Sequence, residues 1–187
     1  MKTIIEVKAL CKSYMSGNSP LRVLDHIDLN IRRGEFISLM GPSGSGKSTL
    51  LNIIGTMDAP DSGEIRIADR RVTDMPERQL AEFRLKHIGF VFQFHYLLPE
   101  FNIEENVAMP LMIAGASKDN AIKKAREMLD YLGVIDRAHH FPAEVSGGEK
   151  QRAVIGRALI NSPDILLADE PTGNLDKETG IRVLDLF

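Results

Sequence analysis

The sequence predicts an α/β fold, because the spacing of its apolar residues changes twice along the chain. Over residues 23–31 apolar and polar side chains alternate, which is typical of a strand with one buried face. Over residues 118–132 the apolar side chains recur at helical spacing instead. Residues 165–169 form a continuous apolar run ending in an acid, the pattern of a fully buried strand. The chain therefore opens with strands, passes through helices and returns to a core strand.

The β-rich opening contains five expected strands and one helix. In the second strand Val23, Ile27, Leu29 and Ile31 share one parity with Asp25, so we expect one mostly buried face. The third strand is a short apolar run, which favours burial on both faces. We expect the strands at residues 4–8, 23–31, 36–40, 64–68 and 88–93, and the helix at residues 47–56.

The middle section is expected to be helical, with helices at residues 103–114, 118–132 and 148–160. No repeat or proline-rich linker interrupts the chain. We therefore expect a single domain over residues 1–187. Its parts are a β-rich core over residues 1–94, a helical subdomain over about 95–160 and a return to the core over 161–187.

Composition excludes several classes of protein. The net charge of −3 gives no basic footprint for nucleic acid. The single cysteine, Cys11, excludes an internal disulfide and fits a reducing compartment. The first residues do not form a signal peptide, and no apolar run reaches the ~18 residues that span a bilayer. Any link to a membrane is therefore expected to go through a partner.

A glycine-rich loop between an expected strand and an expected helix predicts a site for ATP with Mg²⁺. The segment fits the pattern G-x-x-x-x-G-K-[ST], whose glycines let backbone amides approach phosphate oxygens. Lys47 can reach the β- and γ-phosphates, and Ser48 can bind Mg²⁺. The expected nucleotide contacts come from Gly41, Pro42, Ser43, Gly44, Ser45, Gly46, Lys47, Ser48 and Thr49.

The apolar strand that begins at Ile165 ends in two acids, Asp169 and Glu170. A lone Asp in this place is usually a turn residue, but a phosphate loop in the same chain requires a carboxylate to hold the metal. Asp169 fits that role. Glu170 points to the other side and can act as the general base that poises a water against the γ-phosphate. The alternative for Glu170 is a solvated acid without a role.

A second anion site is expected where Ser146, Gly147, Gly148 and Glu149 begin a helix. Ser146 at the N-cap and Glu149 three residues on form a capping box. Two successive glycines lower helix stability, which indicates a backbone that another group approaches closely. The free amides of this helix start can then bind a phosphate.

The Ser-Gly-Gly-Glu segment resembles the signature motif of ABC ATPases, usually Leu-Ser-Gly-Gly-Gln. Val145 and Glu149 replace the usual Leu and Gln. Tyr14 resembles the aromatic that stacks on adenine, and Gln93 resembles the glutamine that senses Mg²⁺ and couples to the permease. Residues 173–176, which end in Asp176, resemble the D-loop that contributes to the nucleotide site. The resemblance covers essentially the whole chain.

This resemblance implies a phosphate-loop ATPase core with an antiparallel β subdomain and a helical subdomain. It also implies a head-to-tail dimer, in which the phosphate loop of one subunit faces the signature of the second across ATP. The remaining partners would be transmembrane permease subunits, so the protein would lie at the cytoplasmic face of the inner membrane.

Residues 93–110 further resemble the lipoprotein-releasing group of this family, through a Phe-His-x-Leu-Leu-Pro run. Apolar residues after Gln93 then have two interpretations: core of the helical subdomain, or part of a groove that receives the permease. These residues are Phe94, Tyr96, Leu97, Leu98 and Phe101.

The family pattern also requires a histidine beyond the D-loop, which this sequence lacks. The five histidines are His26, His87, His95, His139 and His140, all before Asp169. We therefore expect that the C-terminal part of the core is missing and that the chain alone hydrolyses ATP slowly.

Three alternative functions remain open from sequence. One is a related exporter of drugs or peptides, or a cell-division transporter. A second is a DNA-repair or chromosome ATPase, which the absence of sustained heptads between phosphate loop and signature disfavours. The third is a binding module without catalysis.

Overall fold

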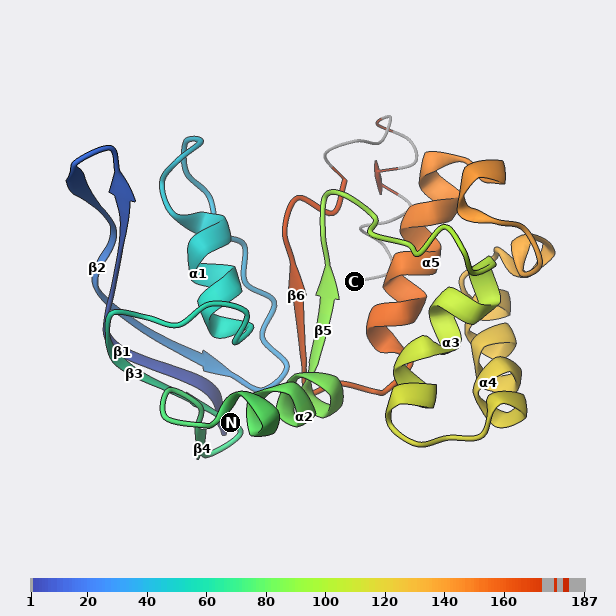
Figure 1. Cartoon of the computed structure of the whole chain (residues 1–187), viewed down its shortest axis with the longest axis horizontal. Coiled ribbons are helices and arrows are strands. Elements are labelled where there is room, and N and C mark those ends of the chain that lie inside the picture. Colours follow the sequence, from blue (N-terminus) through green and yellow to red (C-terminus); the bar gives the residue numbers. More distant parts are fainter. Residues whose placement is uncertain (1, 173–176, 178–179, 182–187) are drawn as a thin grey trace. The chain divides into compact units, whose positions relative to one another are not determined.

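A computed structural model describes residues 2–172, 177 and 180–181, and they group into two compact units. The first unit is Met1–Glu82 and the second is Phe83–Phe187. Figure 1 shows long strands and the helix α1 (Lys47–Ile54) in the first unit, and a short strand pair with the helices of residues 103–159 in the second. The boundary falls within a further helix, α2 (Glu77–His87). Each unit is described by itself below.

The first unit is built on an antiparallel sheet of four strands in the order β2-β1-β3-β4. Its core consists of alternate side chains of β1 and β3, among them Val7, Leu10 and Ile65. This sheet confirms the expected antiparallel β subdomain. The elements are β1 (Thr3–Ser16), β2 (Ser19–Arg32), α1 (Lys47–Ile54), β3 (Ser62–Ile67) and β4 (Arg70–Arg71).

Strand β2 does not keep the single buried face that its alternation predicts. The pairs Leu10↔Ile27 and Lys12↔Leu24 leave two residues of β2 opposite one residue of β1. His26 has a φ of 49° within this bulge. The extra residue of a bulge changes which face the side chains on its two sides occupy. Consequently Leu24, off the expected parity, is buried, while Asp25 is exposed.

The expected strand at residues 36–40 is wrong. These residues have no regular secondary structure, and the side chains of Phe36 and Met40 are 75% and 90% exposed. A strand that is apolar on both faces exists only with strands on either side of it. Within the described residues no strand pairs with this segment, so its composition alone does not make a strand.

The second unit combines two parallel strands with a group of helices. Strand β5 (Ile88–Val91) pairs in parallel with β6 (Ile165–Ala168), from Ile88↔Ile165 to Val91↔Ala168. The expected helices are confirmed to within one residue at each end. They are α3 (Ile103–Ile113), α4 (Lys118–Tyr131) and α5 (Gly147–Leu159), with short 3-10 turns η1 (Ile135–Arg137) and η2 (Pro142–Glu144).

Helix α2 (Glu77–His87), which leads into β5, was not expected from sequence. It is mostly polar, with Leu80, Ala81, Phe83 and Leu85 as its apolar residues, and Phe83 is its only buried residue. A helix with so few apolar residues leaves no period to detect.

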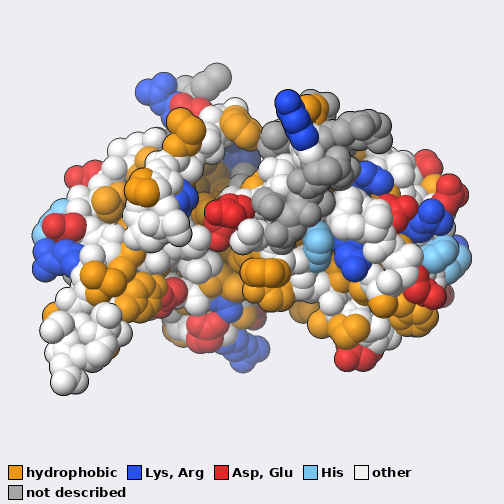
Figure 2. Space-filling view, turned by 90° about the horizontal axis from the view of Figure 1, so that it is seen from above, with side chains coloured by type: hydrophobic (Ala, Val, Ile, Leu, Met, Phe, Trp, Pro, Cys, Tyr) orange, Lys and Arg blue, Asp and Glu red, His pale blue; other side chains and the backbone are white. Residues whose placement is uncertain are grey.

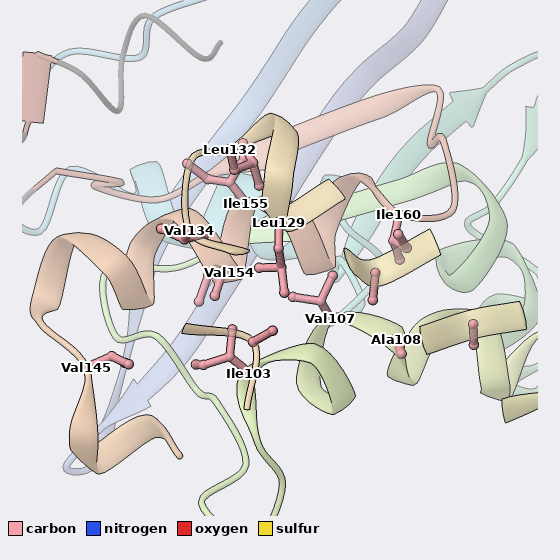
Figure 3. Packing of buried hydrophobic residues seen from close by; sticks show 14 of the residues in the cluster. Ile103, Val107, Ala108, Leu129, Leu132, Val134, Val145, Val154, Ile155 and Ile160 are labelled. Atoms are coloured by element: carbon pink, nitrogen blue, oxygen red, sulfur yellow. The ribbon is translucent and has the colours of Figure 1, made fainter. Parts of the chain in front are cut away.

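The core of the second unit lies among α3, α4 and α5 (Figure 3). Ile103 and Val107 from α3 meet Leu129 from α4 and Ile155 from α5, all with 1% exposure or less. Strand β5 packs closely against helix α5. A Cβ on Gly89 of β5 would lie 2.5 Å from the carbonyl oxygen of Ala158 in α5. The backbones of β5 and α5 are therefore in direct contact.

The surface carries charges of both signs. In the face that Figure 2 shows, Lys and Arg side chains are interspersed with Asp and Glu, so no basic patch dominates it. Of the helices in the described residues, none combines the length and apolarity needed to cross a membrane.

Candidate functional site

The phosphate loop lies in the first unit, where it leads into α1. Gly44 and Gly46 have φ values of 80° and 89°, a region that favours glycine. A Cβ on Gly46 would also lie 3.0 Å from Val23 of β2. No side chain caps the N-terminus of α1. Its first amides, together with the positive end of the helix dipole, therefore form a site for an anion.

Lys47 is held over this loop by the loop's own backbone. Its Nζ donates hydrogen bonds to the carbonyl oxygens of Gly41 and Pro42, both at 2.9 Å. Ser48, in the first turn of α1, is exposed. The ammonium group thus lies at the mouth of the loop, where bound phosphate oxygens can replace the carbonyls as its acceptors.

Tyr14 is positioned at the end of β1 by polar contacts. Its hydroxyl donates to Asp58 Oδ2 at 2.6 Å, and Lys12 Nζ lies 5.0 Å from the centre of its ring. Burial, followed by the bond to Asp58, raises the pKa of the Tyr14 phenol, and a hydrogen bond with Thr49 opposes this. Because Thr49 belongs to the phosphate loop segment, Tyr14 and the loop are neighbours in the first unit.

Gln93, Asp169 and Glu170 lie together at one edge of the β5–β6 pair. Gln93 follows the end of β5 by two residues, and Asp169 directly follows β6. The backbone amide of Asp169 donates to the carbonyl of Val91 at 2.9 Å, which continues the ladder between the two strands. The two strands run in parallel and therefore end at the same edge of the pair, so these three residues follow neighbouring strand ends.

Glu170 has an unusual backbone conformation. Its φ is 48°, and its side chain is exposed. A residue other than glycine adopts a positive φ at a conformational cost, and residues with such backbone angles cluster at functional sites. The conformation turns the chain sharply after β6, so that Glu170 projects differently from Asp169 and the two acids can have different partners.

The helix start at Ser146 forms the expected capping box. Ser146 Oγ accepts from the amide of Glu149 at 3.4 Å, and Glu149 Oε2 accepts from the amide of Ser146 at 2.8 Å. Ser146 and Gly147 are exposed. The turn is therefore rigid, and its two exposed residues present backbone to an incoming group.

Arg137 makes this turn an ionic site as well. Its Nε donates to Glu149 Oε1 at 2.8 Å. This bond, followed by the one from the Ser146 backbone, lowers the pKa of Glu149 from 4.5 to about 2. Glu149 consequently keeps its negative charge over the whole physiological range, and the charge is already neutralised by Arg137 within the same unit.

The apolar residues after Gln93 are only partly core. Leu97 packs on the core, but the other four are exposed by between 36% and 64%. We call these four the apolar patch: Phe94, Tyr96, Leu98 and Phe101. The interpretation of the whole run as core of the helical subdomain is therefore wrong for the patch.

The backbone of the patch is fixed by a buried side chain. Asn106 of α3, with 0% exposure, accepts from the amide of Leu98 at 2.7 Å. Its Nδ2 lies within 3.0 Å of the carbonyls of Leu98, Phe101 and Asn102. The Oδ1 acceptor and the two Nδ2 hydrogens, which three carbonyls share, hold this backbone rigidly, so the patch exposes its side chains from an ordered frame.

Comparison with known proteins identifies the family of this arrangement. The family model described as ABC transporter matches residues 24–173, which contain the phosphate loop, the signature turn and both acids. The chain belongs to the ABC transporter family. Its resemblance to ABC ATPases is thereby confirmed, and so is the hydrolysis of ATP as its activity.

Individual relatives agree with this family. Two proteins named lipoprotein-releasing system ATP-binding protein LolD, from Bacteroides fragilis and Geobacter metallireducens, are 51% and 52% identical to the chain. Each alignment covers 98% of this chain, and 83% and 81% of the respective relative.

Solved structures confirm the ABC ATPase fold. A dimeric ATP-binding cassette with ADP and phosphate bound has a TM-score of 0.91 and 42% identity, over 98% of this chain and 81% of that one. A second dimeric structure of the same bacterial ABC transporter cassette gives a TM-score of 0.91 at 43% identity.

One expected site residue lies outside the described part of the structure, and two residues that hold the site were not predicted from the sequence. Asp176, the expected D-loop residue, lies outside the described residues. Sequence reasoning missed Arg137 and Asn106, which bond to groups 12 and eight residues away. Their only sequence signal was a polar residue inside or beside an apolar helical segment, and that pattern is common without any role.

Proposed function

We propose that this chain is the ATPase subunit of a transporter that releases lipoproteins from the membrane, acting at the cytoplasmic face of the inner membrane. The observation that carries this proposal is the identity of about half of all residues with two lipoprotein-releasing ATP-binding proteins. The apolar patch supports it, because an ordered and exposed apolar surface is typical of a site that binds another protein.

The roles of the site residues within one chain follow from their chemistry. The loop amides and Lys47 bind the β- and γ-phosphates, while Tyr14 stacks on adenine. Ser48, Asp169 and Gln93 supply the oxygen ligands that Mg²⁺ prefers. Mg²⁺, when bound, neutralises phosphate charge. Glu170 takes a proton from the attacking water, and its exposure leaves room for that water.

A complete site needs a second copy of the chain. Ser146 and Gly147 are exposed. We infer that the phosphate bound by this turn comes from another subunit. The solved cassettes with the same fold are dimers. We therefore propose a head-to-tail dimer in which the turn at Ser146, Gly147, Gly148 and Glu149 contacts the γ-phosphate held by the other subunit.

Transmembrane permease subunits are the proposed partners of the apolar patch. An exposed apolar surface of this kind is typical of grooves that receive the apolar face of an amphipathic helix. The test is co-purification of the chain with the permease encoded for lipoprotein release, followed by ATP turnover in the complex with and without a lipoprotein. Stimulation by lipoprotein supports the proposal. Stimulation by a drug or peptide alone would assign the chain to a different exporter.

Tyr96→Glu tests the docking surface directly. Tyr96 is 64% exposed in the patch, so a carboxylate should leave the fold intact and weaken permease binding by about tenfold or more. Tyr131→Glu is the matched control, since Tyr131 is 79% exposed on α4 outside the patch. Binding to immobilised permease is the measurement. Equal binding by the two variants would remove the patch from the interface.

A further inference from the structure

Arg157, near the end of α5, binds the backbone that carries the apolar patch. Its Nη1 donates to the carbonyl of Tyr96 at 2.7 Å, and its Nη2 donates to the carbonyl of His95 at 2.9 Å. Two donors of one planar guanidinium on consecutive carbonyls fix both the position and the orientation of this segment. Among the described residues no carboxylate pairs with Arg157, and burial alone lowers its pKa. The two carbonyls are therefore the acceptors that stabilise a partly buried cation.

The same segment also reaches the first turn of α5. Burial lowers the pKa of the His95 imidazole, and the neighbouring backbone of Gly147, the second residue of the signature, opposes this shift. The Nε2 of His95 is buried and has no hydrogen-bond partner among the described residues. Arg157 lies ten residues further along α5, so the segment at residues 95–96 is bonded near the end of this helix and lies close to its beginning.

These contacts make a continuous path of ordered groups. The patch is fixed to α3 by Asn106 and to α5 by Arg157. Helix α5 begins with the signature turn, where Glu149 and Arg137 hold the capping box. A displacement of the patch must then either move α5 or break two charge-assisted hydrogen bonds.

We propose that Arg157 is a positioning residue: it ties the docking patch to α5, so that binding of a permease at the patch repositions the signature turn at Ser146. This inference rests on the proposed function, because it requires a permease at the patch. It goes further by naming the side chain that carries the effect and the helix through which the effect travels. Arg157 itself touches neither ATP nor the permease.

The test compares Arg157→Met with the wild-type chain in the complex with permease. Methionine keeps the buried stem and removes all donors. Arg126→Met is the control, because Arg126 also makes two hydrogen bonds from a helix of this unit, to Glu104 at 2.6 Å and 3.4 Å. The measurements are basal turnover, permease-stimulated turnover, KM for ATP, and hydrogen exchange of the amides at residues 147–149.

We expect Arg157→Met to lose about tenfold in the stimulation of kcat by permease, with basal turnover and KM for ATP unchanged. Permease should still protect the amides of the patch in this variant, but no longer those of residues 147–149. A residue that serves only stability would lower basal and stimulated turnover together. Arg126→Met should retain full stimulation.

Two outcomes would overturn the inference, and they differ in meaning. If permease stimulates Arg157→Met as it does wild type, the tie to α5 is not used, while the proposed function stands. If permease neither binds nor stimulates the wild-type chain, the proposed function fails as well. Should Arg157→Met not fold, Arg157→Lys decides the question. Lysine keeps the buried cation but not the fork, so partial stimulation is expected, and full stimulation would contradict the inference.

Discussion

Lys47 shows how a single side chain is prepared for its ligand. The two carbonyls that accept from its ammonium group belong to Gly41 and Pro42 of the loop itself. The cation is therefore desolvated in part and oriented before nucleotide arrives. Phosphate oxygens carry more negative charge than carbonyls, so binding exchanges weaker acceptors for stronger ones at little cost in side-chain order.

At this scale we predict that Lys47→Ala abolishes hydrolysis and weakens Mg-ATP binding. Hydrogen bonds to charged groups contribute about 1.5–3 kcal/mol, which corresponds to a loss in affinity of roughly 10- to 100-fold. Isothermal titration calorimetry measures the affinity. The control is Lys123→Ala, on the exposed surface of α4, which should bind normally. Unchanged affinity together with normal turnover in Lys47→Ala would show that this lysine does not meet the phosphates.

Glu149 yields a prediction about pH at the level of helix α5. Its pKa in the folded chain is about 2, below the ordinary value of 4.5, because of Arg137 first and the Ser146 backbone second. The carboxylate therefore stabilises the fold above pH 4.5, and this stabilisation is lost as pH falls towards 2. The shift corresponds to roughly 3 kcal/mol at most.

Glu149→Gln should lower the free energy of unfolding at pH 7 by about 1–3 kcal/mol, since glutamine can still cap the helix but cannot pair with Arg137 as an ion. The difference between variant and wild type should narrow as pH is lowered from 5 to about 2. Urea unfolding at several pH values measures it. A difference that stays constant with pH would mean that the charge of Glu149 does not act on stability.

The contact between β5 and α5 gives a second prediction for an element. A Cβ at position 89 would lie 2.5 Å from the carbonyl oxygen of Ala158 and 3.2 Å from its carbon, both backbone atoms. Backbone cannot rotate away as a side chain can. Gly89→Ala should therefore destabilise the chain by about 1–3 kcal/mol. A denaturant midpoint equal to that of wild type would show that strand and helix separate easily.

Over the whole molecule, local patterns predicted what local interactions determine. Capping signals such as Ser146 and Glu149, and the apolar spacing around Leu129, placed helices α3, α4 and α5 to within one residue at each end. The predicted strand at residues 36–40 is wrong because a strand buried on both faces depends on neighbouring strands as well as on its own composition. Arg157 was not foreseen because its acceptors are 61 and 62 residues away.

Some features of the candidate site were predictable from motifs, and others were visible only in the structure. The motifs identified Lys47, Asp169 and Glu170 because metal and phosphate chemistry restricts the residue types that can serve there. The positive φ of Glu170 and the ion pair of Glu149 needed coordinates, since both arise where the chain meets itself. Family resemblance supplied the second subunit, which no pattern within one chain contains.

The most direct measurement of a site shared between two subunits is the mass of Glu170→Gln in solution with Mg-ATP. The protein used should have the same length as the relatives. The control is Glu127→Gln, because Glu127 is an exposed acid of α4. We predict that Glu170→Gln retains ATP, loses about 10²- to 10⁴-fold in turnover, and sediments as a dimer with two bound nucleotides. The control should turn over ATP normally and show no stable dimer. Wild-type turnover in Glu170→Gln, or a monomer that holds ATP, would contradict the account.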